Sequence, residues 1–129
     1  GNLAAMAALK YSQRNYDEID AIDKVSCRPD FAVLVYPAYL VKDGKLVPEV
    51  QVTKSTPPMF MAHAYNDGVT PESSVLLWLA LKRTGVPAEM HITETGGHGY
   101  GLRKSSSNSH RWPQRCEQWM RERGLLGKM

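Results

Sequence analysis

The sequence has no long apolar run, although 43% of its 129 residues are hydrophobic. A helix that spans a bilayer needs about 20 consecutive apolar residues, so we expect no membrane-spanning segment and no membrane partner. Neither sign of charge is in large excess, since the net charge is only +3. The sequence also lacks a basic stripe interleaved with aromatic residues, which would indicate nucleic-acid binding. A chain of this size can bury a substantial core. The composition therefore predicts one soluble folded domain.

Cysteine is nearly absent. The two that occur, Cys27 and Cys116, lie far apart, without C-x-x-C spacing or a histidine pattern that would indicate zinc. We expect two ordinary thiols and no metal site. Residues 1–10 lack the basic segment, apolar core and cleavage site of a signal peptide. The localisation is therefore unknown, with a cytoplasmic location as the default and a targeting signal upstream of residue 1 left open.

Helical and extended patterns alternate along the chain. Residues 1–10 are rich in Ala and Leu, which favour a helix. The continuous apolar run at residues 31–36 predicts a strand that is buried on both faces of a parallel sheet. Residues 38–56 form a long connection, in which Asp43-Gly44 indicates a tight turn and residues 47–52 a short extended piece.

The second half of the chain repeats this alternation. Residues 59–64 predict a second buried strand. Residues 71–83 predict a helix that ends at Gly85, with an apolar face made of Val75, Leu76, Leu79 and Ala80. A third strand at residues 86–93 alternates more and so belongs nearer the sheet edge, and a helix at residues 112–123 follows. The order predicts an α/β fold with about three parallel strands flanked by helices.

Two polar residues follow consecutive predicted strands. Asp67 lies just beyond the strand at residues 59–64, and His98 lies in a glycine-rich loop beyond the next strand. Ligands collect at the carboxyl ends of strands in open α/β sheets. Without further support, Asp67 would be interpreted as a turn residue and His98 as a loop residue without a specific role. The same order also matches the acid and histidine of an α/β-hydrolase triad.

Other polar residues are weaker candidates. His63, at the end of a strand and four residues before Asp67, is expected to have a packed or hydrogen-bonded structural role. Several serines could be imagined as nucleophiles, but none lies in a turn that would expose and activate its hydroxyl; they are Ser12, Ser73, Ser74 and residues 105–107.

Four motifs occur in a specific order: His-x-x-x-Asp-x-Val-x-Pro from His63, a predicted helix holding Ser and Leu, Gly-Val-Pro-Ala-Glu from Gly85, and Gly-Gly-His-Gly-Tyr-Gly from Gly96. Over most of residues 29–120 they resemble the dienelactone-hydrolase and acetyl-xylan-esterase-like branch of the α/β-hydrolase serine esterases. The opening Gly-Asn-Leu-Ala-Ala is similar to the segment that follows the Gly-x-Ser-x-Gly nucleophile elbow of that family. No Gly-x-Ser-x-Gly occurs in the 129 residues. The resemblance implies that residues 1–129 form a single partial domain, the C-terminal portion of the fold without its nucleophile.

The resemblance also implies a chemistry. Asp67 would orient and stabilise the imidazole, and His98 would act as general base and then as acid to the leaving alcohol. The substrates would be small acyl or carbohydrate acetyl esters, hydrolysed without a cofactor, although lactones, amides and peptides use the same triad. The alternative is a non-catalytic hydrolase remnant that acts as a binding or assembly module. An uncovered edge at residues 31–36 would also favour a homo-oligomer.

Overall fold

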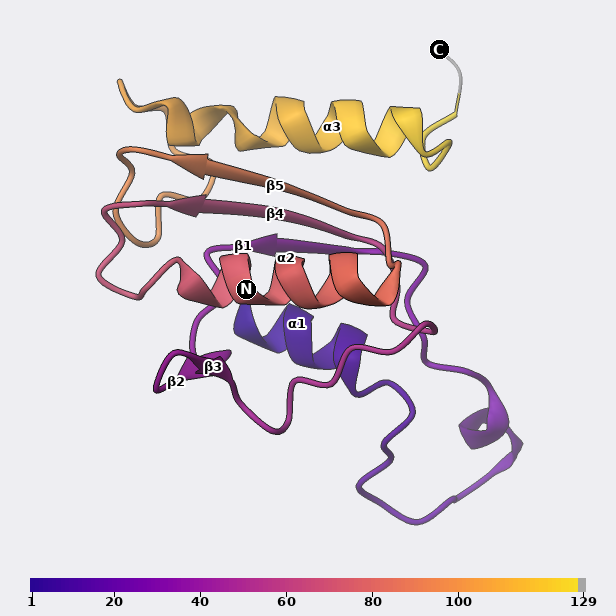
Figure 1. Cartoon of the computed structure of the whole chain (residues 1–129). Coiled ribbons are helices and arrows are strands. Elements are labelled where there is room, and N and C mark those ends of the chain that lie inside the picture. The colour runs from indigo at the N-terminus through magenta and orange to yellow at the C-terminus, as the bar shows by residue number, and fades with distance from the viewer. Residues whose placement is uncertain (128–129) are drawn as a thin grey trace.

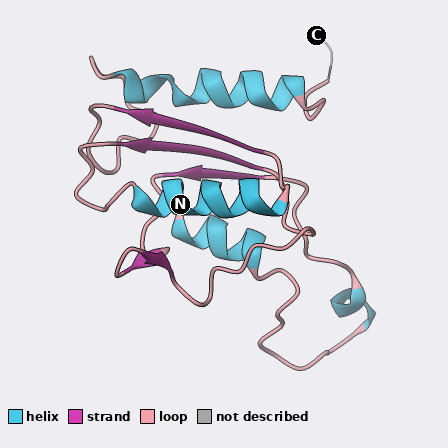
Figure 2. Ribbon diagram, in the orientation of Figure 1, coloured by secondary structure: helices cyan, strands magenta, loops and turns pink. Residues whose placement is uncertain are grey.

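The computed structural model of the chain describes residues 1–127. A three-stranded sheet lies between helices on its two faces, and a small hairpin lies to one side (Figures 1 and 2). No described helix is long and apolar enough to cross a membrane. In chain order, the elements are α1 (Asn2–Leu9), the 3₁₀-helix η1 (Ala21–Lys24), β1 (Ala32–Val35), β2 (Val41–Lys42), β3 (Lys45–Leu46), β4 (Met59–Ala64), α2 (Glu72–Thr84), β5 (Ala88–Thr93), the 3₁₀-helix η2 (Asn108–Arg111) and α3 (Trp112–Glu122).

The main sheet is parallel, in the order β1-β4-β5. Its register pairs Val35 with Ala62 and Ala62 with His91, so all three strands end at one edge. This confirms the predicted α/β architecture of three parallel strands flanked by helices. β4 is central and every one of its residues is buried, while β5 forms an edge, as its alternating pattern predicted.

Each face of the sheet has its own apolar core. Helices α1 and α2 cover one face and α3 covers the other (Figure 1). β4 serves both cores because successive side chains of a strand point to opposite faces: Met59 and Met61 pack in the cluster with α1 and α2, whereas Phe60 packs with Trp119 of α3. The central strand therefore fixes both helical layers.

The prediction that β1 is buried on both faces is wrong. Ala32 and Leu34 are buried, but Val33 and Val35, on the opposite face, are only partly so. β1 lies at an edge of the sheet, and its alternating burial is that of a strand covered well on one face, where α1 packs. A continuous apolar run thus does not by itself distinguish a central strand from an edge strand.

The connection after β1 holds a hairpin that the sequence showed only through its turn. Asp43 and Gly44 both have positive φ, +51° and +71°, as a two-residue hairpin turn requires. They join β2 to β3, which are two residues long each. The extended piece predicted at residues 47–52 is not a strand. β2 and β3 are too short to show the alternation of apolar and polar residues that identifies a strand, so the sequence indicated only the turn between them.

Helix α2 was predicted at the right place with the wrong buried face. It ends at Gly85, whose φ of +78° and backbone bonds to Leu81 and Lys82 make a left-handed cap. The predicted apolar face, Val75, Leu76, Leu79 and Ala80, is only partly buried. The buried residues are Ser73, Ser74, Leu77 and Leu81. Two serines therefore lie where the apolar pattern would have placed aliphatic side chains.

Residues 11–30 form an arm that extends away from the sheet and its helices (Figure 1). The arm carries η1, which is capped reciprocally by Asp20 and Asp23. The Asp23 carboxylate also accepts hydrogen bonds from the Tyr16 hydroxyl, at 2.9 Å, and from the guanidinium of Arg14. A polar network, with no buried residue in η1, thus shapes this arm.

Candidate active site

Asp67 and His98 meet at the carboxyl edge of the sheet. Asp67 lies in the turn after β4 and His98 in the loop after β5, and these strands are neighbours. The Nδ1 of His98 lies 2.9 Å from Oδ2 of Asp67 and 3.1 Å from Oδ1. Because a carboxylate can only accept, Nδ1 carries the proton and donates. The two residues that the sequence singled out are therefore a hydrogen-bonded acid–imidazole pair.

The turn after β4 holds the Asp67 carboxylate in a fixed orientation. The Asp67 N–H donates to the carbonyl of Ala64, and the Val69 N–H donates to Oδ1 of Asp67 at 2.7 Å. The side chain of Asp67 is fully buried. A buried carboxylate is tolerated only where donors satisfy its oxygens, and here the Val69 N–H and the His98 imidazole supply the hydrogen bonds.

The His98 loop is fixed by close packing at its glycines. A Cβ on Gly96, whose φ is +156°, would lie 2.7 Å from the Cβ of Ser109 and 3.0 Å from that of Ala64. The Gly97 N–H donates to the Asn66 side chain at 2.8 Å, which joins this loop to the Asp67 turn. The imidazole of His98 is nevertheless 44% exposed. One side of the ring is thus held by Asp67 while the other is open to a ligand.

Tyr36, just after β1, also packs against the imidazole and leaves part of it exposed. Its ring centroid lies 4.8 Å from that of His98 and 4.9 Å from that of Tyr100. The φ of Tyr36 is +40°, which is rare for a residue with a bulky side chain and typical of functional sites when it occurs. Burial raises the pKa of Tyr100, helped by nearby Tyr36 and Asp67, so the Tyr100 hydroxyl stays protonated.

His63 lies behind Asp67. It is buried and hydrogen-bonded, in line with the expected structural role, but its contact with Asp67 was not predicted. Its Nε2 lies 3.2 Å from Oδ2 of Asp67, and its Nδ1 lies 2.8 Å from the hydroxyl of Ser74. Ser74, His63 and Asp67 are the residue types of a catalytic triad. Ser74 is completely buried, however, so its hydroxyl cannot reach a substrate.

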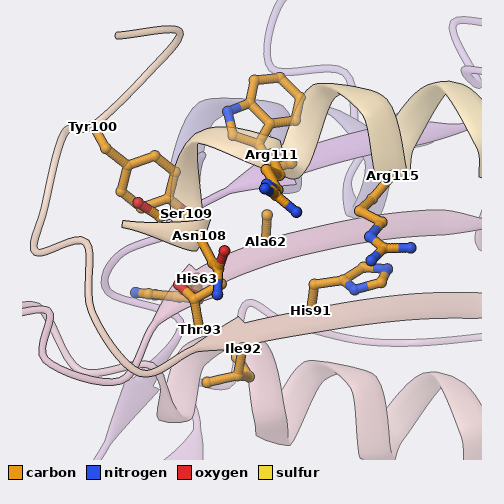
Figure 3. A pocket seen from close by; sticks show the side chains of 11 residues that line it. Ala62, His63, His91, Ile92, Thr93, Tyr100, Asn108, Ser109, Arg111 and Arg115 are labelled. Carbon is orange, nitrogen blue, oxygen red and sulfur yellow. The ribbon is translucent and has the colours of Figure 1, made fainter. Parts of the chain in front are cut away.

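A pocket of about 240 Å³ lies beside the site, between the β4–β5 strands and the η2–α3 segment (Figure 3). Tyr100, which contacts Tyr36, forms part of its wall, and Arg111 and Arg115 lie on its α3 side. Its lining includes neither Asp67 nor His98. Among residues 1–127, no group of three or more His, Cys, Asp or Glu side chains could hold a metal ion.

The acid–imidazole pair at the end of a parallel sheet is accompanied by a match to a known family. Residues 6–124 match the prolyl oligopeptidase family, peptidase S9. The chain belongs to this family. Membership agrees with the α/β-hydrolase resemblance of the sequence, and the solved structures similar to this chain include esterases with that fold.

Three solved structures illustrate the likeness. The acetyl ester-xyloside bifunctional hydrolase from Caldicellulosiruptor lactoaceticus is 31% identical, with a TM-score of 0.83, over 97% of this chain and 54% of its own. The α/β hydrolase MGS-M1, from a Medee basin deep-sea metagenome library, is 22% identical over 92% of this chain and 50% of its own, with a TM-score of 0.70. Esterase 2 from Thermogutta terrifontis, phosphonylated by cyclosarin, is 17% identical over 98% and 52%, with a TM-score of 0.69.

This family member spans about half the length of these three structures. Comparison with curated proteins gives no match. The two structures below 25% identity show the fold alone. The relatives are hydrolases and support a hydrolase-type family, whereas the residues that act on a substrate in this chain have to be argued from its own geometry.

Proposed function

We propose that this chain supplies the acid and the general base of a serine-type carboxylic ester hydrolase. The observation that carries the proposal is the 2.9 Å contact between Nδ1 of His98 and Oδ2 of Asp67, in which the carboxylate is buried and the imidazole is partly open. The buried carboxylate fixes the tautomer of the ring, so Nε2 is the nitrogen that can accept a proton.

The reaction then follows from the position of that nitrogen. Nε2 of His98 takes the proton of a serine hydroxyl as the hydroxyl oxygen attacks the ester carbonyl. The imidazolium, stabilised by Asp67, gives the proton to the leaving alcohol as the C–O bond breaks. Water then attacks the acyl-serine, with His98 again taking a proton and returning it to the serine oxygen. The proton balance closes without a cofactor.

The serine comes from outside these 129 residues in this proposal. A Cβ at Gly1 would lie 2.5 Å from the carbonyl oxygen of Val35 and from Cα of Pro37, so α1 begins in tight contact with the end of β1. Tyr36, between those two residues, contacts the His98 ring. A peptide that precedes Gly1 would therefore enter beside the imidazole, which supports a nucleophile a few residues upstream, as the sequence resemblance implies.

Small acyl and carbohydrate acetyl esters are the proposed substrates. The support is the name of the relative from Caldicellulosiruptor lactoaceticus, an acetyl ester-xyloside bifunctional hydrolase. The non-catalytic alternative, a binding or assembly module, has less support. The similar structures named above for an activity are hydrolases, and the acid–imidazole pair is intact.

We also propose that the chain on its own forms a homo-oligomer through the outer edge of β1. β1 pairs with β4 on one side only, and its sequence carries no Lys, Pro or bulge that would protect the other side. Sedimentation at micromolar concentration tests this, and a monodisperse monomer would contradict it.

The test of the enzymatic proposal combines turnover with labelling. A chain extended upstream to include the proposed serine is assayed with a short aryl acetate beside its His98→Ala and Asp67→Ala variants, and a serine-directed fluorophosphonate is read by intact mass. We expect turnover that both substitutions abolish, with one label per active chain, whereas residues 1–129 alone should show neither turnover nor label. Turnover that survives both substitutions would contradict the roles of Asp67 and His98. Absence of turnover and label in the extended chain would contradict the proposal and favour the module.

A further inference from the structure

The mechanism above gives no role to the buried imidazole of His63. Its side chain has no solvent exposure and lies on β4, directly against the Asp67 carboxylate. Both of its ring nitrogens have partners: Nδ1 faces the hydroxyl of Ser74 at 2.8 Å, and Nε2 faces Oδ2 of Asp67 at 3.2 Å and the carbonyl of Val69 at 3.1 Å. A side chain that only filled space would not need three polar contacts.

These partners determine where the His63 proton resides. The carbonyl of Val69 and the carboxylate of Asp67 are both acceptors, so Nε2 has to carry a proton. The hydroxyl of Ser74 can donate as well as accept, so it can satisfy a bare Nδ1. The neutral ring with its proton on Nε2 is therefore the form that meets all three contacts.

The neutral form is also the one that the surroundings favour. Burial lowers the pKa of His63, against the opposing effects of the Val69 carbonyl and the Asp67 charge. His98 shares the same carboxylate and is 44% exposed. Of the two imidazoles that contact Asp67, His63 is therefore the buried one, and it stays a neutral donor.

We propose that His63 is a positioning residue for Asp67: its Nε2–H donates to the Val69 carbonyl and lies 3.2 Å from Oδ2, which fixes the turn so that both carboxylate oxygens stay directed at Nδ1 of His98. The N–H of Val69 anchors Oδ1 at 2.7 Å, and His63 anchors Val69 through its carbonyl. Ser74, at the start of α2, holds the His63 ring in turn. This inference rests on the proposed function for its catalytic meaning, but its geometry can be measured without turnover.

Two substitutions separate positioning from packing. His63→Leu keeps an apolar side chain of similar size and removes the donor. His63→Gln can place an amide N–H near the position of Nε2 and so restores it. If His63 acts through its proton, the glutamine variant resembles the unaltered chain and the leucine variant does not; if it only fills space, the two variants behave alike.

The experiment is ¹⁵N–¹H correlation NMR of the histidine rings in the chain and its variants. We expect His63 to show a proton on Nε2 and a bare Nδ1. We also expect the Nδ1–H signal of His98 to move in His63→Leu and to return to its original position in His63→Gln. A His63 protonated on Nδ1, or a His98 signal that is identical in both variants, would overturn the proposal. The tautomer of the unaltered chain decides even if His63→Leu does not fold.

Turnover separates this inference from the proposed function. In the chain extended upstream to include the proposed serine, and with an aryl acetate as substrate, we expect His63→Leu to lower kcat about ten- to a hundredfold, the scale of a misplaced catalytic group, with KM little changed. His63→Gln should recover most of the loss. Full turnover in His63→Leu would refute positioning and leave the ester hydrolase standing. No turnover in any form, together with the expected NMR result, would refute the hydrolase while the role of His63 in orienting the pair holds.

Discussion

Two aspartates in this molecule collect hydrogen bonds in similar ways and end in very different situations. Asp67 accepts from a backbone N–H and from His98, and the Nε2 of His63 lies 3.2 Å from its Oδ2. Asp23, on the arm, accepts from backbone N–H groups, from the Tyr16 hydroxyl and from Arg14. Both carboxylates fix a turn in the chain. The number of donors therefore does not distinguish a reactive site from a structural one.

The chemistry of the partners does distinguish them. The guanidinium of Arg14 stays protonated, so the Asp23 network cannot pass a proton to anything. Donors from the Ile19 backbone and the Tyr16 hydroxyl hold the pKa of Asp23 at about 2, which makes it a permanent anion. Asp67 faces an imidazole that can gain and lose a proton and has one open side. Only the arrangement of Asp67 and His98 can take part in acid–base catalysis.

The largest difference should appear when each carboxylate is replaced by an amide. Asp67→Asn reverses the tautomer preference of His98, and we expect it to lower the turnover of an aryl acetate by about 10⁴-fold. Asp23→Asn removes a comparable network on the arm and should leave turnover unchanged. The measurement is kcat for both variants at equal folded concentration, made in the chain extended upstream to include the proposed serine. Equal losses would remove the distinction between the two aspartates.

Next in size is the effect of close packing around the His98 loop. Gly96→Ala would force a Cβ to within 2.7 Å of the Ser109 side chain, and we expect the free energy of unfolding to fall by about 1–3 kcal/mol. Gly97→Ala meets no neighbour and bears only the cost of its positive φ, about 1 kcal/mol. Denaturant titration of both variants measures the difference. A smaller loss for Gly96→Ala than for Gly97→Ala would show that the packing is not tight.

The pH dependence of stability should separate the two regions further. His63 has a lowered pKa in the folded state, so the unfolded chain binds its proton first, and the free energy of unfolding falls as pH drops below the usual histidine value of 6.5. The Asp23 contribution persists to lower pH and is lost as pH falls from 3.8 through about 2.

Denaturant titrations across pH in His63→Gln and Asp23→Asn check this assignment. His63→Gln should lack the component below pH 6.5, and Asp23→Asn should lack the one below 3.8. An unchanged profile in either variant would assign that component to another group.

The smallest effect concerns the arm alone. Arg14→Ala should leave the free energy of global unfolding unchanged, because η1 contributes no buried residue to the core. It should speed proteolysis within residues 11–30, because the Arg14–Asp23 ion pair is lost. Lys24→Ala, which removes an exposed ion pair with Glu18, is the control and should change neither quantity. Mass spectrometry of the first cleavage products gives the answer, and first cuts outside the arm would contradict it.

Most of the fold was predictable because its strands and helices have strong local patterns. The strand at β4 was predicted with its observed bounds, and Gly85 marked the end of α2 because a left-handed cap favours glycine. The buried face of α2 was not predictable by hydrophobicity. Ser74 is buried because it bonds to His63, and that contact depends on tertiary structure.

The candidate site was partly readable from the sequence. Asp67 and His98 were identified by their place after consecutive strands, and the parallel sheet brings them together; their catalytic roles remain predictions. The contact of His63 with Asp67 was missed because four residues separate them along a strand and a turn, where side chains normally diverge. The pattern His-x-x-x-Asp held that information, but only the turn geometry at Ala64 shows how the chain folds back.

The unequal exposure of the two imidazoles gives the molecule a built-in chemical reporter. An acylating reagent for histidine, such as diethyl pyrocarbonate, can reach His98, which is 44% exposed, whereas His63 has no accessible side-chain surface. Modification of His98 would therefore record whether a ligand covers the site. Modification of His63 would record how often β4 and its neighbouring turn open. One reagent therefore reports both whether a ligand occupies the site and how often the site opens by local unfolding.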